Sequence, residues 1–173
     1  MSAPTDGDRS DRIEAEWRRE RPDLDPSSIG VVTRVWELGK IFGDRRRRLL
    51  AEQGIDPALM DLLGLLRRGG APHAMSTREL TERAMVSAGA ISQRVARAED
   101  SGLVTRRTAT DGTRAVLVTL TKSGHDLIER TVDHVLTRES ELVASLTPAS
   151  RELLAGQLQE LLGEVEQVAR KPS

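Results

Sequence analysis

The sequence predicts a mainly α-helical chain with a small β-hairpin wing, in the order of a winged helix-turn-helix. A leucine-rich composition without tyrosine and with 2% aromatic residues favours helix over sheet. Residues 76–107, STRELTERAMVSAGAISQRVARAEDSGLVTRR, hold a capped short helix and then a second helix whose first turn is built of small residues. Two β-branched runs separated by a turn sequence follow it, so this fold class is favoured over an all-β domain.

Two helices are predicted ahead of this stretch. Residues 11–20 give a short helix with Trp17 on its apolar face. Asp25 followed by Pro26 is a cap and a first helical position, and it predicts a long helix that ends at Gly54.

The helix-turn-helix is predicted from its capping residues. Asp56 and Pro57 start a helix that closes at Gly69 and Gly70, and Ser76 with Glu79 forms a capping box for a helix over 77–84. Ser87 caps the next helix, which runs through about Asp100 and ends at Gly102.

The C-terminal part is predicted as a hairpin and two helices. Residues 103–109 and 114–121 are β-branched runs joined through TDGT, a hairpin signal. A helix over 122–146 follows, and Thr147 with Pro148 starts the last one. Leucines recur along it at helical spacing over 153–165, and such a row needs a surface to pack against. This row favours a homodimer.

The net charge of −1 conceals an uneven distribution. It is +3 in residues 26–74 and +3 in 75–123, against −3 in 1–25 and −4 in 124–173. A positive centre suits a phosphate backbone. Solvated helix faces explain the charges equally well.

Several classes of function are disfavoured. There is no cysteine, and His73, His125 and His134 lack ligand spacing, so we expect no metal site and no cofactor. No nucleophile–base pair or phosphate-binding glycine loop is present, so we expect no catalytic residues and no enzyme. No apolar run of 18 residues and no secretory signal is visible, so we expect a cytoplasmic protein without membrane contact.

The small residues that open the second helix predict close approach to DNA. A recognition helix must bring its first turn to base edges in the major groove. We therefore expect Ser87, Ala88, Ser92 and Gln93 to face bases, Arg97 to reach the backbone, and Ile91, Val95 and Ala98 to be buried. The alternative is that residues 90–94 lie on the exposed side of a core helix.

From Val31 to Val168 the chain resembles the MarR family of bacterial transcriptional regulators. The stretches ISQRVARAEDSGLVTRR and VLVTLTKSGHDLI carry the resemblance. It implies an all-helical dimerisation region made of the N- and C-terminal helices, and a homodimer that reads a pseudo-palindromic DNA site. It also implies that a small ligand lowers the affinity for DNA.

The resemblance divides the chain into four parts. They are a flexible N-terminus (1–10), an added helix with a dimerisation helix (11–53), a winged helix-turn-helix DNA-binding domain (54–121) and C-terminal dimerisation helices (122–173). The wing departs from the family pattern, D-R-R, because Gly112, Thr113 and Arg114 stand there. Arg114 matches the arginine that enters the minor groove, while the aspartate is absent or displaced to Asp111.

The added helix, with EAEWRRERPDLD, resembles the urate-responsive, PecS-like branch of the family. That branch implies an effector site for a purine-like anion at Trp17, Asp61, Arg94 and Arg106. An aromatic face stacks on a flat ring, arginines pair with negative charge, and a carboxylate accepts N–H groups. Two arginines would also accept a tricarboxylate such as citrate or aconitate.

Other roles are open for these four residues. Trp17 would equally serve as the apolar anchor of an N-terminal arm, Asp61 as part of a solvated face, and Arg94 and Arg106 as phosphate contacts. For the whole protein, the alternative to a ligand-responsive repressor is a winged-helix protein-interaction module that does not read DNA. The acidic total charge and the altered wing are the points in favour of that module.

Overall fold

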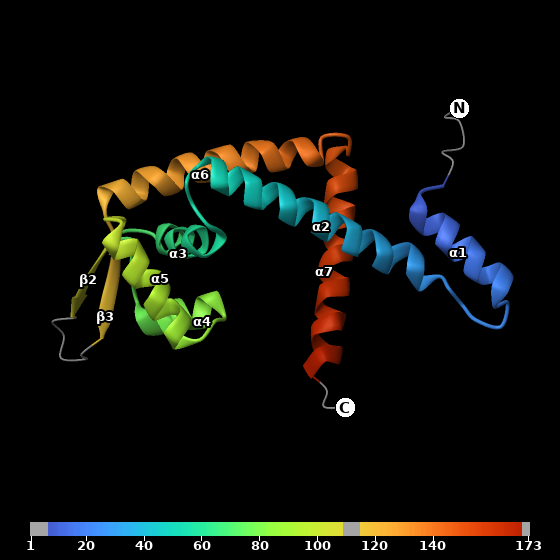
Figure 1. Cartoon of the computed structure of the whole chain (residues 1–173), viewed down its shortest axis with the longest axis horizontal. Coiled ribbons are helices and arrows are strands. Elements are labelled where there is room, and N and C mark those ends of the chain that lie inside the picture. The colour runs from blue at the N-terminus through green and yellow to red at the C-terminus, as the bar shows by residue number, and fades with distance from the viewer. Residues whose placement is uncertain (1–6, 109–114, 171–173) are drawn as a thin grey trace. The chain divides into compact units, whose positions relative to one another are not determined.

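The structure, a computed structural model, describes residues 7–108 and 115–170. Its helices are α1 (Arg9–Glu20), α2 (Ser28–Glu52), α3 (Pro57–Arg68), α4 (Thr77–Ala84), α5 (Ala88–Asp100), α6 (Lys122–Leu142) and α7 (Pro148–Arg170). Its strands are β1 (Ala74–Ser76), β2 (Val104–Thr108) and β3 (Val116–Leu120) (Figure 1). The order confirms the predicted mainly helical, winged helix-turn-helix fold.

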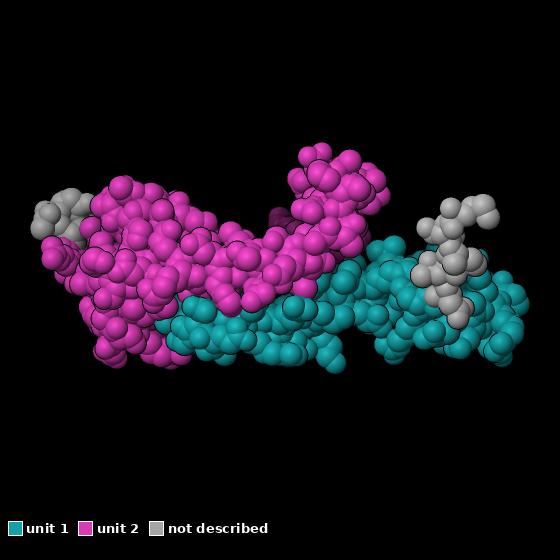
Figure 2. Space-filling model, turned by 90° about the horizontal axis from the view of Figure 1, so that it is seen from above, with its two compact units in different colours: residues 1–61 teal, residues 62–173 magenta. Residues whose placement is uncertain are grey.

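The chain divides into two compact units, residues 1–61 and 62–173, coloured teal and magenta in Figure 2. In the first unit, α1 packs on α2 (Figure 1). Asp8 at the start of α1 pairs with Arg34, whereas Glu14, farther along α1, lies beside Gly30 nearer the start of α2, so the two helices run antiparallel. The second unit contains most of α3 and everything that follows.

The sheet has one strand more than the sequence predicts. Strand β3 lies in the middle, antiparallel to β2 on one side and to β1 on the other. The missed strand β1 has only three residues, with Met75 opposite Val118. A run this short shows no alternation that a sequence pattern can detect.

Two helix ends also differ from the prediction. Helix α2 begins at Ser28 rather than Pro26, because the Asp25 carboxylate accepts hydrogen bonds from the Ser27 backbone N–H and hydroxyl, at 3.0 Å each. The Pro26 carbonyl then accepts from the Ile29 N–H, which makes a turn before the helix. Helix α6 ends at Leu142, four residues earlier than predicted.

Apolar side chains from seven elements make the core of the second unit. They are Leu62, Leu63, Leu66, Met75, Leu80, Ile91, Val95, Ala98, Val104, Val118, Ile128 and Val135. Ile91, Val95 and Ala98 are the residues that the sequence predicts on the buried face of the recognition helix. The core thus fixes which face of α5 points outward. Helix α7, by contrast, buries none of its residues.

Candidate nucleic-acid interface

Helices α4 and α5 form a helix-turn-helix whose ends are closed by the predicted caps. The Ser76 hydroxyl accepts from the Glu79 N–H, and the Glu79 carboxylate accepts from the Ser76 N–H at 2.8 Å. Met85 takes a left-handed conformation (φ 51°) at the end of α4, and Ser87 then accepts from the Ala90 N–H at 3.2 Å. These contacts hold the turn between the helices to three residues.

The outer face of α5 carries the residues that the sequence predicts against DNA. Ser87, Ala88, Ser92, Gln93 and Arg97 are all exposed. Because their side chains are short except at Gln93 and Arg97, the backbone of the first turn is open to close approach. Their contacts with bases and phosphates stay predictions.

A cleft of about 510 Å³ lies in the second unit between α4, α5 and the hairpin. Ala88 and Ser92 line it together with Arg106, a predicted effector residue. Thr77, Arg78, Thr81, Glu82, Val95 and Val116 complete its lining. The structure therefore brings two predicted base-facing residues and one predicted effector residue to a single cleft.

Arg106 lies on β2, opposite Val118 of β3, and is held by Glu99 at the end of α5. The Arg106 Nε donates to the Glu99 Oε2 at 2.6 Å, and the Arg106 backbone N–H donates to the Oε1 at 3.1 Å. A second ion pair joins the Nη2 to the same carboxylate. The hydrogen bond from the Arg106 side chain lowers the pKa of Glu99 below its usual value. Strand β2 of the wing is thereby held against the recognition helix α5 by an ion pair.

The other predicted effector residues are divided between the units. Trp17 on α1 and Asp61 on α3 belong to the first unit, whereas Arg94 and Arg106 belong to the second. Asp61 is exposed and Arg94 is half-buried on α5. The set of four as one pocket stays a prediction.

Trp17 lines a second pocket, of about 300 Å³, within the first unit. Its other lining residues are Leu24, Asp25, Pro26, Ser28 and Ile29, from the connection after α1 and the start of α2. Trp17 is 49% exposed, so its ring is neither buried as a core residue nor fully solvated. This exposure fits both an effector contact and the alternative role of Trp17 as the apolar anchor of an N-terminal arm.

Arg114 and the altered wing segment, Asp111 to Thr113, lie outside the described residues. The predicted minor-groove contact of Arg114 therefore stays a prediction.

Sequence reasoning missed the partners of two arginines. It did not find Glu99 beside Arg106, although opposite charges flank the turn at Gly102 (φ 69°), a weak signal for such a pair. It also missed the contact of Arg34 with Asp8, because 26 residues separate them. Only the packing of α1 on α2 brings those two residues together.

The described part of the chain offers no metal-binding group, since no three His, Asp or Glu side chains gather within it. None of the described helices combines the length and apolarity needed to cross a bilayer.

Known proteins are similar to this chain in sequence and in fold. A model of the MarR family matches residues 53–115. The HTH-type transcriptional regulator PecS of Dickeya dadantii (strain 3937) is 30% identical over 154 residues, which covers 89% of this chain and 90% of PecS. Apo MarR from E. coli is 26% identical with a TM-score of 0.57, covering 73% of this chain and 94% of that one. Sco5413 from Streptomyces coelicolor, a MarR family transcriptional regulator, is 18% identical with a TM-score of 0.65, covering 82% and 96%.

The capped helix-turn-helix, the hairpin wing and these relatives define a winged helix-turn-helix transcriptional regulator. The chain belongs to the MarR family, and the predicted resemblance to PecS-like regulators is confirmed. Its homologues are regulators rather than enzymes, as the sequence predicts.

Proposed function

We propose that this protein is a repressor that binds a pseudo-palindromic operator as a homodimer and is released by a small anionic effector. The observation that carries the proposal is α5, whose core-facing residues are buried and whose capped outer turn presents Ser87, Ala88 and Ser92. Identity to PecS along 89% of the chain supports the same role. The N-terminal helices and residues 122–173 supply the dimer in this proposal, around a DNA-binding part at 54–121.

The effector we favour is urate or a similar purine, bound by Trp17, Asp61, Arg94 and Arg106. The Arg106 guanidinium is already paired with a carboxylate, that of Glu99, so an anionic ligand offers it a like partner. If Arg106 paired with the ligand in place of Glu99, the contact between β2 and α5 would be loosened while the ligand is bound. This gives coupling between the effector and DNA sites. A tricarboxylate such as citrate is the second candidate.

The experiment is fluorescence anisotropy of a labelled duplex from the region upstream of the gene, titrated with urate and separately with citrate. We expect tight binding that falls steeply with salt, because phosphate contacts release counterions. Urate should release the wild type at concentrations that leave a Trp17→Ala variant on the duplex. Release by citrate alone would retain the repressor and replace the effector.

The wing supplies a second arm of the same experiment. Arg114→Ala should weaken operator binding, by roughly 1–3 kcal/mol if its side chain reads the minor groove. Weak binding without sequence preference at every salt concentration, and no effect of Arg114→Ala, would favour the protein-interaction module over the repressor.

A further inference from the structure

Helix α1 is attached to α2 with little apolar packing. Of its 12 residues only Ser10 is buried, and its largest side chain, Trp17, is half exposed. A helix of this length is marginal by itself in water, so its contacts with α2 must hold it. Apart from Trp17, which lines a pocket with Ser28 and Ile29, the side chains of α1 that contact α2 are charged.

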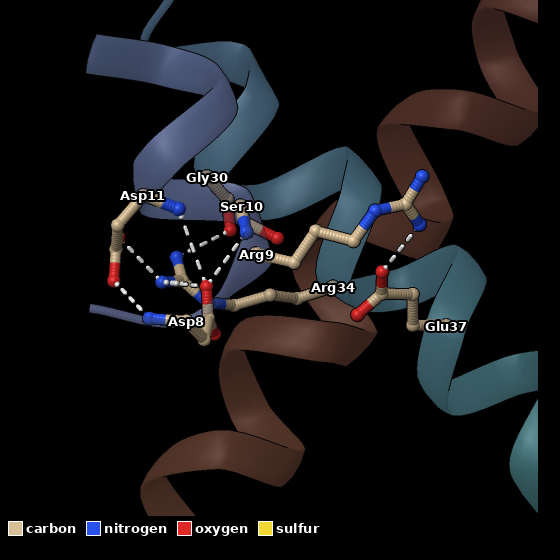
Figure 3. Close-up of polar contacts among 7 residues, drawn as sticks. All are labelled: Asp8, Arg9, Ser10, Asp11, Gly30, Arg34 and Glu37. Carbon is tan, nitrogen blue, oxygen red and sulfur yellow. Dashed lines mark hydrogen bonds and ion pairs between the residues drawn. The ribbon is translucent and has the colours of Figure 1, made fainter. Parts of the chain in front are cut away.

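Arg34 of α2 is the centre of these contacts (Figure 3). Its Nε donates to the Asp8 Oδ2 at 2.8 Å and its Nη2 to the Asp8 Oδ1 at 3.1 Å, as a planar fork on one carboxylate. The same Nη2 donates to the Asp11 Oδ1 at 2.6 Å, and the Nη1 donates to the Gly30 carbonyl at 2.8 Å. We call Asp8, Asp11 and Arg34 the Arg34 cluster.

The cluster acts on the residues that start α1. Asp8 is the N-cap of α1 and accepts from the backbone N–H groups of Ser10 and Asp11, while the Asp11 carboxylate accepts from the Asp8 N–H at 3.1 Å. Arg34 therefore binds both carboxylates of the capping box. Its hydrogen bond lowers the pKa of Asp8, which keeps that carboxylate ionised.

Two further contacts keep the helices close. Arg9 pairs with Glu37 at 2.9 Å, three residues beyond Arg34 along α2 (Figure 3). At Gly30 a Cβ would lie 3.2 Å from the Glu14 Oε2 of α1, so the absent side chain leaves room for α1. Antiparallel docking through these residues fixes the whole of α1 on α2.

Trp17 depends on that docking. It lies nine residues after Asp8, roughly 14 Å along the helix axis, and its pocket partners Pro26, Ser28 and Ile29 belong to the connection and the start of α2. If α1 leaves α2, Trp17 leaves these partners. The ion pairs at the N-terminal end of α1 thus determine whether Trp17, near its C-terminal end, stays in contact with these partners.

We propose that Arg34 is a positioning residue for Trp17: through Asp8 and Asp11 it docks α1 on α2, and because charge makes the attachment, α1 is released by salt or by loss of Arg34. The docking stands on the contacts above. Its consequence for the effector response rests on the proposed function, since it assumes that Trp17 contacts the effector.

The docking is tested on Trp17 fluorescence in a Trp36→Phe background, where Trp17 is the one remaining tryptophan of the sequence. We expect Arg34→Ala to increase acrylamide quenching of Trp17 and to lower its anisotropy. In the protein that keeps Arg34, high salt should also increase quenching and lower anisotropy, because exposed ion pairs are screened. In Arg34→Ala, high salt should change neither quantity much. Arg47→Ala is the matched control, since Arg47 pairs with Asp44 of its own helix.

A double-mutant cycle separates docking from folding of α1. Asp8→Asn removes the charge but keeps a good N-cap residue. If Arg34 acts through Asp8, then Asp8→Asn should raise quenching much as Arg34→Ala does, and the double variant should add little to either. Additive effects, or unchanged quenching in Arg34→Ala, would overturn the proposal.

The regulatory consequence is measured by duplex anisotropy. If α1 of Arg34→Ala is docked only a tenth of the time, this variant should need about tenfold more urate than the wild type for release, each measured on a duplex concentration set by its own affinity for DNA. Absence of any urate response in the wild type would contradict the proposed effector while leaving the quenching result in place. A normal urate response in an Arg34→Ala variant whose α1 is shown to be undocked would overturn the role of Arg34 in positioning Trp17 for the effector.

Discussion

Gly124, at the start of α6, lies against the backbone that follows the recognition helix. A Cβ at this position would lie 2.0 Å from the Leu103 carbonyl oxygen, and that oxygen also accepts a hydrogen bond from the Thr121 N–H at 3.1 Å. The carbonyl is therefore held in place and cannot yield to a side chain. Glycine is required here by space rather than by backbone conformation.

We accordingly expect Gly124→Ala to lower the free energy of unfolding by about 1–3 kcal/mol, as overpacking does. Gly156→Ala is the matched control, because a Cβ there would meet nothing within 4 Å beyond its neighbours and the backbone of its own helix, and alanine is the better helix former by about 1 kcal/mol. Urea unfolding followed by circular dichroism would measure both. A Gly124→Ala variant as stable as the wild type would contradict the close contact.

The Glu99–Arg106 pair makes a residue-scale prediction about pH. The pKa of Glu99 is lowered by its hydrogen bond from Arg106, so the ionised carboxylate stabilises the attachment of β2 to α5. This contribution is complete above the ordinary pKa of glutamate and is lost as pH falls through the lowered value. Arg106→Gln should therefore raise the pKa of Glu99 back toward its usual range. An NMR titration of the Glu99 carboxyl carbon measures this, and an unchanged pKa would show that Arg106 does not cause the shift.

At the scale of elements, capping residues next to each helix in the sequence were sufficient to predict where most helices start. Asp56, Ser76, Ser87 and Thr147 were predicted as helix starts, and each side chain accepts a backbone hydrogen bond at the start of its helix. These contacts span three residues, so the sequence nearby contains both partners. Strand β1, by contrast, exists only through its pairing with β3, more than 40 residues later.

The same distinction applies to the site. The outward face of α5 follows from the helical spacing of Ile91, Val95 and Ala98, so its exposed residues were predictable. The partners of Arg34 and Arg106 were not, since they depend on how one element packs on another. Sequence periodicity determines the face of a helix but not which side chain lies opposite it.

The exposed residues of α5 are expected to contact DNA in two ways, Arg97 at a phosphate and Gln93 at a base, and mutation distinguishes the two. If Arg97 contacts a phosphate, Arg97→Ala should weaken binding about equally for all duplex sequences and reduce the salt slope by about 1. Gln93→Ala should instead relax the preference at one base pair. Anisotropy at several salt concentrations, on the operator and on single-base variants, measures both. A sequence-dependent loss in Arg97→Ala would assign that arginine to base reading.

At the scale of the whole molecule, apolar residues exposed on α7 require a partner. Leu154, Leu158, Leu161 and Val165 recur on one face of α7 and are all exposed in the single chain. A contiguous apolar face of this kind marks an interaction surface. A second copy of the chain is the expected partner, as the leucine row predicts.

Leu158→Glu should accordingly dissociate the dimer, because burying an unpaired carboxylate costs several kcal/mol and weakens association by at least about a hundredfold. Gln159→Glu adds the same charge one residue on, away from the leucine row, and should leave the association unchanged. Sedimentation equilibrium of both variants tests this. Since two recognition helices must reach two half-sites together, Leu158→Glu should also lose operator affinity while a single half-site binds as before. A Leu158→Glu protein that remains dimeric would place the dimer contact elsewhere than on this face of α7.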